Sequence, residues 1–583
     1  MLDKLLSSLQ GIPAYSILIS AVVVIFIAVS VLVMFGTARQ EKEIEQLRWE
    51  KVSAHMALYD NARRVVIPLE ADEILVGRHG AADIRFTDMS VSRYHAVLYV
   101  SNGVWSVMDL GSKSGTYVNG RKIRSQVKLK DMDEIRFGTK SVVIRQRRRE
   151  CAMYKNGLRY GSCTAIVLLT HTIMLLAVLL RGNYDTPQDI LPLTVAVIGL
   201  DIVYSIVLHF MYRQMTYTLD FVLLLLINIS VMFQSCFGGV GFAAKHYVTC
   251  IVALAVCQVG FLLTRNHVWI QSKKIVLYIL LGVLILSILL LTGSRSMWIN
   301  IGPISIQPSE FMKPVFVLIC ATSIREQHEK KKILFFYVSK EMMILTGAFI
   351  VIVGLQWWCR DLGSLPTFAA AYGCALACRL CYPKAKFSKK TIIGISAIAA
   401  ILVALALRFA PGYVQNRLSV DIWNQMEGDG YQQCKALIAI AEGGLFGKGP
   451  GCGSLYKVFA SDTDIVFSTI CEEWGFLVAL LSILILMAMM LLPMINKPRS
   501  YFHTTMILGC VAVLIVQMGL NIFGSCNLIP FTGVTIPFIS QGGSSMITSG
   551  FLAGMLKAGQ SPVFKKPEPK KKKLKTRKAV TAA

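Results

Sequence analysis

Residues 14–36 read AYSILISAVVVIFIAVSVLVMFG, an apolar run without a charged side chain. A helix needs about 20 such residues to cross the hydrocarbon core of a bilayer, so this stretch is long enough to span a membrane. No cleavage site of small residues follows it, which predicts an uncleaved anchor rather than a signal peptide. The charged, helix-favouring residues 37–62 then predict a juxtamembrane linker.

Apolar runs of membrane-spanning length recur through most of the remaining chain. Of the 583 residues, 54% are hydrophobic and only 16% are charged, and the mean hydropathy is +0.57. These values exclude a water-soluble enzyme and indicate a polytopic all-α membrane bundle. Twelve further spans are predicted near residues 161–181, 190–212, 219–238, 246–264, 273–293, 311–326, 340–355, 364–381, 390–410, 464–492, 502–528 and 537–557.

The distribution of positive charge predicts which face of the membrane each loop occupies. The formal net charge is +26, and Lys and Arg gather in short runs between spans and in the Lys-rich tail, residues 562–583. With twelve spans after residue 147, these runs fall on one face, which the positive-inside rule makes cytoplasmic. The basic excess therefore indicates orientation in a membrane and no nucleic-acid partner. Residues 410–463 are then extracytoplasmic, and the anchor crosses from outside to inside.

The fifteen cysteines predict neither a disulfide framework nor a metal site. Most of them lie inside apolar runs, where cysteine acts as a small hydrophobic residue. Cys374 and Cys378 have helical spacing within a predicted span, and this favours packing over metal binding. We expect no cofactor, with a divalent metal ion at the 410–463 loop as the open alternative.

Between residues 63 and 147 the hydrophobic period changes to two. Short runs rich in Val, Ile, Phe and Trp are divided by Gly, Asn, Asp and Ser, a pattern typical of a β-sandwich. Guanidinium and hydroxyl groups in its loops can donate hydrogen bonds to phosphate oxygens, which predicts a phosphate-binding site. The motifs that supply these groups are Gly77-Arg78, Ser92-Arg93-Tyr94-His95 and Gly115-Thr116-Tyr117-Val118-Asn119-Gly120.

Over this whole stretch the sequence resembles the forkhead-associated (FHA) domain, whose loops bind phosphothreonine. The resemblance implies that an Arg after Gly and a Ser-Arg pair contact the phosphate, that a His supports their loop, and that an Asn shapes the last loop and contacts the ligand backbone. Ser114 stands where the family usually has Asn, which bears on recognition of the residue after phosphothreonine. The predicted phosphopeptide-binding residues are Arg78, Ser92, Arg93, His95, Ser114 and Asn119.

A second set of motifs lies between and within the later spans. In order they are Ile306-Gln307-Pro308-Ser309-Glu310-Phe311-Met312-Lys313, Asp361-Leu362-Gly363, Gly430-Tyr431-Gln432, Glu442-Gly443-Gly444-Leu445-Phe446-Gly447-Lys448-Gly449, Asp462-Thr463-Asp464-Ile465-Val466-Phe467, Glu472-Glu473-Trp474-Gly475 and Pro537-Phe538-Ile539-Ser540-Gln541-Gly542-Gly543-Ser544-Ser545. With these motifs, residues 219–557 resemble the SEDS family of FtsW, RodA and SpoVE. The resemblance implies ten core spans and a polymerase of lipid II that makes peptidoglycan glycan strands, usually with a class B penicillin-binding transpeptidase. The anchor and the two spans within residues 161–212 are additions to that core.

Ionisable residues in or beside spans are costly and therefore indicate function. The predicted substrate-binding residues of this kind are Glu310, Lys313, Asp361 and Arg417. The cations Lys313 and Arg417 would hold a pyrophosphate leaving group, while a carboxylate would deprotonate the attacking sugar hydroxyl. The adjacent residues Glu472 and Glu473 fit a functional role and a purely structural pairing equally.

The resemblance fails at the position of the family's catalytic Asp. That Asp precedes the Tyr of the Gly-Tyr-Gln motif by six residues, and this chain has Gln425 there. A neutral amide cannot act as a general base. Glu427 and Asp429 follow within four residues and are predicted to be catalytic in its place. Asp462, where the family commonly has His, is a second departure.

Two functions of different class are compatible with these residues. The first is a phosphorylation-regulated peptidoglycan glycosyltransferase in division, elongation or sporulation. Its predicted partners are lipid II, a class B transpeptidase, membrane lipids and a phosphothreonine protein made by a Ser/Thr kinase. The second is a catalytically degenerate scaffold that binds lipid II or the transpeptidase under phosphothreonine control. A transporter has the span count but lacks an internal repeat, and the enzyme is favoured.

Overall fold

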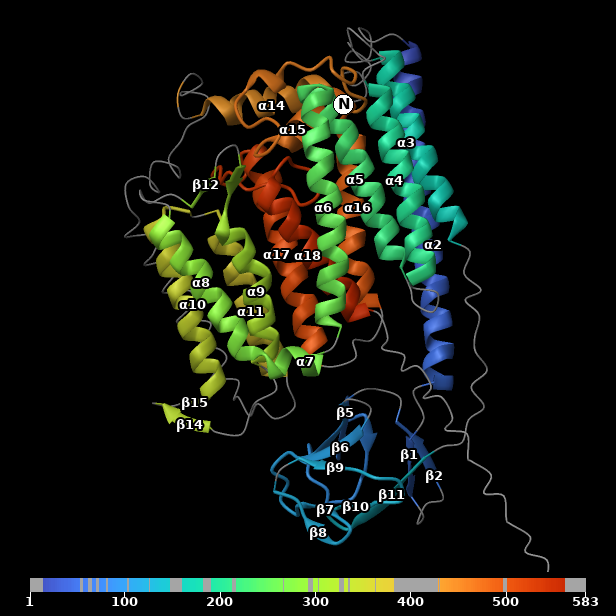
Figure 1. Cartoon of the computed structure of the whole chain (residues 1–583), viewed down its shortest axis with the longest axis vertical. Helices are drawn as coiled ribbons and strands as arrows, with labels where there is room; N and C mark the ends of the chain where they lie inside the picture. Colours follow the sequence, from blue (N-terminus) through green and yellow to red (C-terminus); the bar gives the residue numbers. More distant parts are fainter. Residues whose placement is uncertain are drawn as a thin grey trace, which may run out of the picture.

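A β-sandwich domain and a helical bundle, joined by one long N-terminal helix, make up the computed structural model (Figure 1). Several predicted features, among them the span 390–410, lie outside the described residues. The structure describes residues 14–52, 56–60, 65–69, 73–79, 82–101, 104–124, 126–146, 160–181, 190–211, 217–265, 267–291, 297–301, 304–323, 330–333, 336–361, 363–381, 428, 430–495 and 501–560.

The β-domain consists of two packed sheets, with strand orders β2-β1-β11-β10-β7-β8 and β4-β3-β5-β6-β9. Alternating residues such as Leu58, Val107 and Ile135 point inward and form one core, as the period-two pattern predicted. The strands are β1 Met56–Asp60, β2 Val65–Pro68, β3 Glu73–Gly77, β4 Ile84–Arg85, β5 Ala96–Ser101, β6 Val104–Asp109, β7 Thr116–Val118, β8 Arg121–Lys122, β9 Val127–Lys128, β10 Glu134–Phe137 and β11 Lys140–Gln146.

The β-domain begins earlier than the sequence indicated. Strand β1, Met56–Asp60, lies between β2 and β11 and is antiparallel to both. The domain therefore starts before the expected residue 63, and the linker predicted over 37–62 ends before Met56, whereas its residues 37–52 are helical as expected. Met, Ala and Leu at the start of β1 are strong helix formers, so their strand conformation is set by pairing with distant β11 rather than by local propensity.

Within the described residues, nine helices are long and apolar enough to cross a membrane. They are α2 Ala14–Val52, α3 Gly161–Arg181, α4 Ile190–Met211, α5 Thr218–Gly238, α6 Val240–Thr264, α8 Lys274–Leu291, α10 Lys340–Trp358, α16 Phe476–Ile495 and α17 Tyr501–Ser525. Shorter or less apolar helices α9 Pro308–Thr322, α11 Leu365–Cys381 and α18 Gly543–Gln560 pack with them where spans were predicted. The remaining elements are α7 His267–Ser272, α14 Tyr431–Gly443, α15 Val466–Trp474, a 3-10 turn Leu455–Lys457, and the hairpins β12 Ile299–Ile301 with β13 Ile304–Ile306 and β14 Lys330–Ile333 with β15 Phe336–Ser339.

The predicted span 464–492 is not one helix. It consists of α15 and α16, which meet at Gly475 with φ 90°. A Cβ at Gly475 would lie 2.3 Å from the carbonyl oxygen of Leu445, so the backbones approach too closely for any side chain. The break is caused by a tertiary contact that the apolar pattern does not record.

Close helix contacts hold the bundle together. Helix α5 is buried on nearly all sides, and α6 packs against α18 through glycines. A Cβ at Gly554 would lie 2.1 Å from the carbonyl oxygen of Cys257, and one at Gly550 would lie 2.4 Å from that of Ala253. Small residues allow such approach between membrane helices. A buried ion pair, 2.7 Å long, between Asp220 of α5 and Lys557 of α18 joins these two helices.

Candidate functional site

Arg78 follows strand β3 and lies beside the loop that carries Ser92 and Arg93. Its backbone N–H donates to the carbonyl of Ser92 at 3.0 Å, and the N–H of His79 donates to the carbonyl of Arg93 at 3.0 Å. Gly77 permits this approach, because a Cβ there would lie 2.2 Å from the carbonyl oxygen of Arg93. The structure therefore brings the three predicted phosphate donors to one end of the sandwich.

The guanidinium groups at this end are suited to an anion. Arg78 is half-buried, its Nη1 lies 3.1 Å from the sulfur of Met89, and its Nε is buried with no hydrogen-bond partner among the described residues. Arg93 is exposed on the adjoining loop. Planar N–H donors of this kind match phosphate oxygens in charge and geometry.

His95 supports the loop that carries Ser92 and Arg93. The imidazole is fully buried; its Nδ1 accepts from the N–H of Ser92 at 3.0 Å, and its Nε2 lies 3.1 Å from the carbonyl oxygen of Gly115. These partners require the neutral tautomer with its hydrogen on Nε2. Burial lowers the pKa of His95, which favours the same neutral form. The ring thus joins the Ser92 loop to the Gly115 loop.

Two serines complete this part of the site. Ser92 Oγ accepts from the backbone N–H of Lys113 at 2.9 Å, which leaves its own hydroxyl hydrogen to donate to a ligand. Ser114, at the place of the family's Asn, donates its hydroxyl to the carbonyl of Ser90. The Ser114 side chain is therefore engaged inside the site, and it pins one loop to the other.

Asp109 is a supporting residue that the sequence analysis missed. Its carboxylate accepts from the N–H groups of Gly111 at 2.7 Å and Ser112 at 2.9 Å and from the Thr116 hydroxyl at 2.7 Å. Burial by itself would raise the pKa of Asp109, but hydrogen bonds from Ser112, Thr116 and Gly111 outweigh it and lower the pKa. The signal that could have found it is the run Asp-Leu-Gly-Ser, which favours a side-chain-stabilised turn.

Asn119 shapes the hairpin between β7 and β8. Asn119 and Gly120 have φ values of 48° and 78°, the left-handed pair that a two-residue turn of this type requires. The Asn119 amide donates to Asp133 Oδ1 at 2.9 Å, and its Oδ1 accepts from the N–H of Glu134 at 2.9 Å. Its side chain is therefore occupied within the domain, while its contact with a ligand stays a prediction.

In the membrane bundle, Glu310 and Lys313 form a buried ion pair at the start of α9. Lys313 Nζ lies 2.6 Å from Glu310 Oε1, and the two side chains are only 1% and 8% exposed. The second carboxylate oxygen of Glu310 is buried without a partner among the described residues. A cation and an anion kept inside a membrane bundle are costly, which is why such pairs indicate a functional path.

Asp361 contacts Gln307, which lies three residues before Glu310. Gln307 Nε2 donates to Asp361 Oδ2 at 3.4 Å, and the Gln307 N–H donates to the Ser544 hydroxyl at 3.0 Å. Asp361 also accepts from the Ser364 hydroxyl at 2.8 Å at the start of α11. Three motifs that are far apart in sequence, those at 306–313, 361–363 and 537–545, therefore meet at one place.

The motif at 462–467 joins the same region. Asn521 of α17 donates to the carbonyls of Asp464 at 2.8 Å and Val534 at 2.7 Å, and Gln541 N–H donates to the Asp462 carbonyl at 3.0 Å. Burial raises the pKa of the Asp464 carboxyl to about 6, a hydrogen bond from Thr463 opposes the rise, and the charge of Asp462 adds to it. Asp464 is a further candidate residue that the sequence analysis quoted without assigning it a role.

The glycine-rich motif 442–449 packs backbone to backbone against the end of α15. A Cβ at Gly443 would lie 2.0 Å from the carbonyl oxygen of Cys471, and one at Gly447 would lie 2.2 Å from that of Glu473. The glycine spacing is therefore explained by close approach and not by ligand binding. In Figure 1, α14 and α15 lie at the end of the bundle opposite the β-domain.

Glu472 and Glu473 differ in what they contact. Glu472 accepts from Lys448 Nζ at 2.9 Å and from the N–H groups of Ser454 and Leu455 at 2.9 Å each, so it clamps the loop 448–455. Glu473 accepts from the N–H of Gly451 at 3.0 Å, while its Oε1 is buried without a partner among the described residues. The structural reading of Glu472 is thereby favoured over a catalytic one.

Four residues of the proposed chemistry, Arg417, Gln425, Glu427 and Asp429, lie outside the described residues. Their predicted roles stay predictions. The segment that follows them is described: α14 begins at Tyr431 of the Gly-Tyr-Gln motif and ends at Gly443. Among the described residues, no cluster of three or more His, Cys, Asp or Glu side chains could hold a metal ion.

Comparisons with known proteins agree with both resemblances. The FtsW/RodA/SpoVE family model, described as "Cell cycle protein", matches residues 207–559, and the FHA domain model matches residues 74–138. A probable peptidoglycan glycosyltransferase FtsW from Saccharophagus degradans is 28% identical over 367 residues, which cover 59% of this chain and 92% of that protein. A probable FtsW from Synechocystis sp. is 30% identical over 295 residues, which cover 48% of this chain and 72% of that protein.

Among solved structures, one chain comes from a study of the structural coordination of polymerization and crosslinking by a peptidoglycan synthase complex. It is 20% identical, covers 59% of this chain and 97% of its own length, and has a TM-score of 0.45. The FtsW/RodA/SpoVE model alone covers more than half of the 583 residues. The chain is therefore a membrane protein of the FtsW/RodA/SpoVE family, a family that includes peptidoglycan glycosyltransferases, with an added FHA domain.

Proposed function

We propose that the bundle polymerises lipid II into peptidoglycan glycan strands and that the FHA domain places this reaction under phosphothreonine control. The observation that carries the proposal is the buried Glu310–Lys313 pair, in the same motif as Gln307, which contacts Asp361, within a chain whose relatives are named peptidoglycan glycosyltransferases. A buried ammonium group 2.6 Å from a single carboxylate is suited to exchange that partner for an anionic substrate group.

In the proposed reaction, a sugar hydroxyl of one lipid II attacks the anomeric carbon of a second glycan chain. A new C–O bond forms, and the bond from that carbon to the pyrophosphate oxygen breaks, with its electron pair leaving on the pyrophosphate. Lys313 and Arg417 would stabilise the leaving charge, and Glu310 and Asp361 would position the substrate. A carboxylate, Glu427 or Asp429, would take the hydroxyl proton.

The proposed orientation follows from the loop charges. The FHA domain and the Lys-rich tail would lie in the cytoplasm, where Ser/Thr kinases phosphorylate the partner protein, and residues 410–463 would lie outside. A class B transpeptidase would crosslink the strands that the chain makes. No cofactor is proposed, and a divalent metal ion at the outer loop remains the alternative for stabilising the pyrophosphate.

Gln425 supports a second candidate function. Because an amide cannot accept the hydroxyl proton, the chain would instead be a degenerate member that binds lipid II or the transpeptidase and presents it in response to a phosphothreonine signal. The two candidates differ in one measurable property, polymer formation.

The test is lipid II polymerisation by the purified full-length protein, alone and with its transpeptidase, next to a standard relative. Glu427→Gln and Asp429→Asn remove each candidate base with little change of shape. Glycan product from the wild type, lost in one of these variants, supports the enzyme. No product under conditions in which the relative is active supports the scaffold.

A further inference from the structure

Helix α2 extends without interruption from the outer loop to the FHA domain. It spans Ala14–Val52, 39 residues, which corresponds to about 58 Å at the rise of an α-helix. It contains no proline, and Gly36 is its only glycine. Figure 1 shows it along the edge of the bundle beside α3 and reaching beyond the bundle toward the β-domain. A continuous helix of this length can transmit a displacement of one end to the other.

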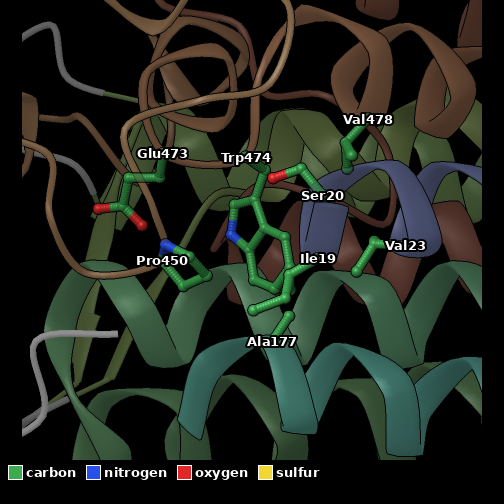
Figure 2. A pocket seen from close by; sticks show the side chains of 8 residues that line it. All are labelled: Ile19, Ser20, Val23, Ala177, Pro450, Glu473, Trp474 and Val478. Atoms are coloured by element: carbon green, nitrogen blue, oxygen red, sulfur yellow. The ribbon is translucent and has the colours of Figure 1, made fainter. Parts of the chain in front are cut away.

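At one end, α2 contacts the segment that follows the Gly-Tyr-Gln motif. The Ser20 hydroxyl donates to the backbone carbonyl of Phe446 at 3.0 Å. Ile19, Ser20 and Val23 also line a cavity together with Pro450 and Trp474, as the side chains in Figure 2 show. The same cavity is lined by Glu473, whose partner Gly451 belongs to the loop clamped by Glu472.

Polar contacts hold α2 to the bundle along its length. The Ser30 hydroxyl lies 2.7 Å from that of Thr170 in α3, and both are buried. Further along, the Thr37 hydroxyl lies 3.4 Å from Cys163 Sγ. In a helix pair packed mainly by apolar side chains, such contacts select one register of α2 against α3.

Glu41 makes a further polar contact between α2 and the bundle. Its Oε1 accepts from the backbone N–H groups of Tyr217 at 3.1 Å and Thr218 at 3.0 Å and from the Tyr160 hydroxyl. The first N–H groups of a helix have no partner within it, so Glu41 caps α5 from a different helix. The side chain is completely buried.

Beyond Glu41 the chain enters the FHA domain almost directly. Helix α2 ends at Val52 and strand β1 begins at Met56, paired on both edges. Only residues 53–55 separate the helix end from the first strand, and a chain extends by only a few ångströms per residue, so a large displacement of the sandwich must move the helix end. A displacement of the FHA domain therefore acts on α2, and through Ser20 it acts on the segment 443–455.

We infer that α2 is the coupling element through which phosphopeptide binding to the FHA domain changes the conformation of residues 443–455. This inference rests on the proposed function in that the regulated reaction is glycan polymerisation. The regulated segment directly follows α14, whose first residue comes six positions after Gln425. Binding on one side of the membrane would thus alter, on the other side, a segment that follows the candidate bases closely in sequence.

The test measures hydrogen–deuterium exchange of residues 443–455 in the full-length protein, reconstituted in lipid nanodiscs. The informative amides are those of Gly447, Lys448 and Gly449, which donate to carbonyls of Gly443, Glu472 and Glu473 at 2.8, 2.8 and 3.0 Å. The probe is a phosphothreonine peptide selected on the wild-type protein from a degenerate library, with its unphosphorylated form as the blank. The uncoupling variant carries ten Gly and Ser residues inserted after Val52.

We expect saturating phosphopeptide to change the exchange rates at least threefold in the wild type and by less than 1.3-fold in the insertion variant, with peptide Kd equal within twofold. Leu32→Ala, on the exposed face of the same helix, is the control that should respond as the wild type does. An unchanged wild-type rate, or a full response in the insertion variant, would overturn the inference.

A second arm needs no peptide. Glu41→Ala leaves the Tyr217 and Thr218 amides without their acceptor and should raise exchange at residues 443–455, whereas Glu41→Gln keeps an acceptor oxygen and should not. Equal exchange in the two variants contradicts the coupling. Lipid II polymerisation is measured separately. If the protein does not polymerise lipid II but exchange at residues 443–455 responds to phosphopeptide, the coupling stands and the proposed glycosyltransferase function fails. If the protein polymerises lipid II but exchange does not respond, only the coupling fails.

Discussion

Glu472 and Glu473 are adjacent in α15, but their carboxylates have different hydrogen-bond partners. Glu472 Oε1 lies 2.9 Å from Lys448 Nζ, whereas Glu473 Oε1 has no hydrogen-bond partner among the described residues. Burial raises the pKa of Glu472, but hydrogen bonds from Ser454, Leu455 and Lys448 outweigh it and lower the pKa. Burial raises the pKa of Glu473 to about 8, so this group is mainly protonated at neutral pH.

Glu472→Gln should destabilise the protein, and Glu473→Gln should not. Loss of the charged acceptor at 472 weakens several hydrogen bonds, at about 1.5 to 3 kcal/mol for one bond to a charged group. At 473 the glutamine replaces a carboxyl that is already neutral. Thermal unfolding of both variants at pH 7 in the same detergent measures the difference, and equal midpoints would contradict the assignment.

Glu473 and Glu472 should make opposite contributions to the pH dependence of stability, because their pKa values are shifted in opposite directions. Between about pH 4.5, the ordinary value for Glu, and about pH 8, the folded state holds the Glu473 proton while the unfolded chain releases it, so stability falls as pH rises. Glu473→Gln should remove this fall. The Glu472 contribution has the opposite sign: it is present above pH 4.5 and is lost as the pH drops through the lowered pKa.

Arg78→Ala should weaken phosphopeptide binding to the FHA domain by about 1.5 to 3 kcal/mol, roughly ten- to more than hundredfold in Kd. The guanidinium supplies donors that only the phosphate can engage. Calorimetry with phosphorylated and unphosphorylated peptides measures the change. Lys128→Ala is a matched control, because it removes an exposed cation from β9, at the opposite edge of the sheet from β4. Equal binding of both peptide forms to the wild type would refute the phosphate site.

Lys313→Met should destabilise the bundle by about 3 to 5 kcal/mol, since it leaves the Glu310 carboxylate buried and unpaired. The double variant Glu310→Gln with Lys313→Met should recover most of that stability and still fail to polymerise lipid II. Unfolding midpoints and polymerisation assays on the same preparations separate the two effects. Polymerisation by the double variant at the wild-type rate would show that the pair is purely structural.

Gln425→Asp should raise glycosyltransferase activity if the missing carboxylate is what limits the chain. If Glu427 or Asp429 already serves as base, a second carboxylate nearby should do little or reduce the rate, because like charges raise each other's pKa. Initial rates with one lipid II preparation and one transpeptidase compare the two forms. If neither form reacts while a standard relative polymerises, Asp462 or substrate binding becomes the better explanation.

Cys452 is an exposed cysteine and offers a test of orientation. A membrane-impermeant maleimide added to intact cells should label it, because residues 410–463 are expected outside. Cys452→Ser should lose that label. In this background, Thr87→Cys on the exposed surface of the FHA domain should be labelled only after permeabilisation. Labelling of Thr87→Cys in intact cells would reverse the proposed topology.

Much of the architecture was determined by the sequence itself, because membrane spans and alternating strands depend on local composition and period. Apolar length identified the helices α3, α4, α5 and α17 nearly to the residue, and the period of two identified the sandwich core. The motifs of the β-domain predicted that Arg78, Ser92 and Arg93 share one end of the sandwich, and backbone hydrogen bonds join the segments that carry them.

Tertiary structure alone decided the rest, because those features depend on partners that are distant in sequence. Gly475 breaks the predicted span only because Leu445 approaches its Cα, and β1 becomes a strand only because β11 pairs with it. From the sequence, Glu41 is one charged residue of a helical linker. Only the tertiary structure shows that it accepts hydrogen bonds from the backbone amides of Tyr217 and Thr218 at the start of α5. Local patterns encode which elements form, and the environment of a single carboxylate is set by the packing of whole elements against one another.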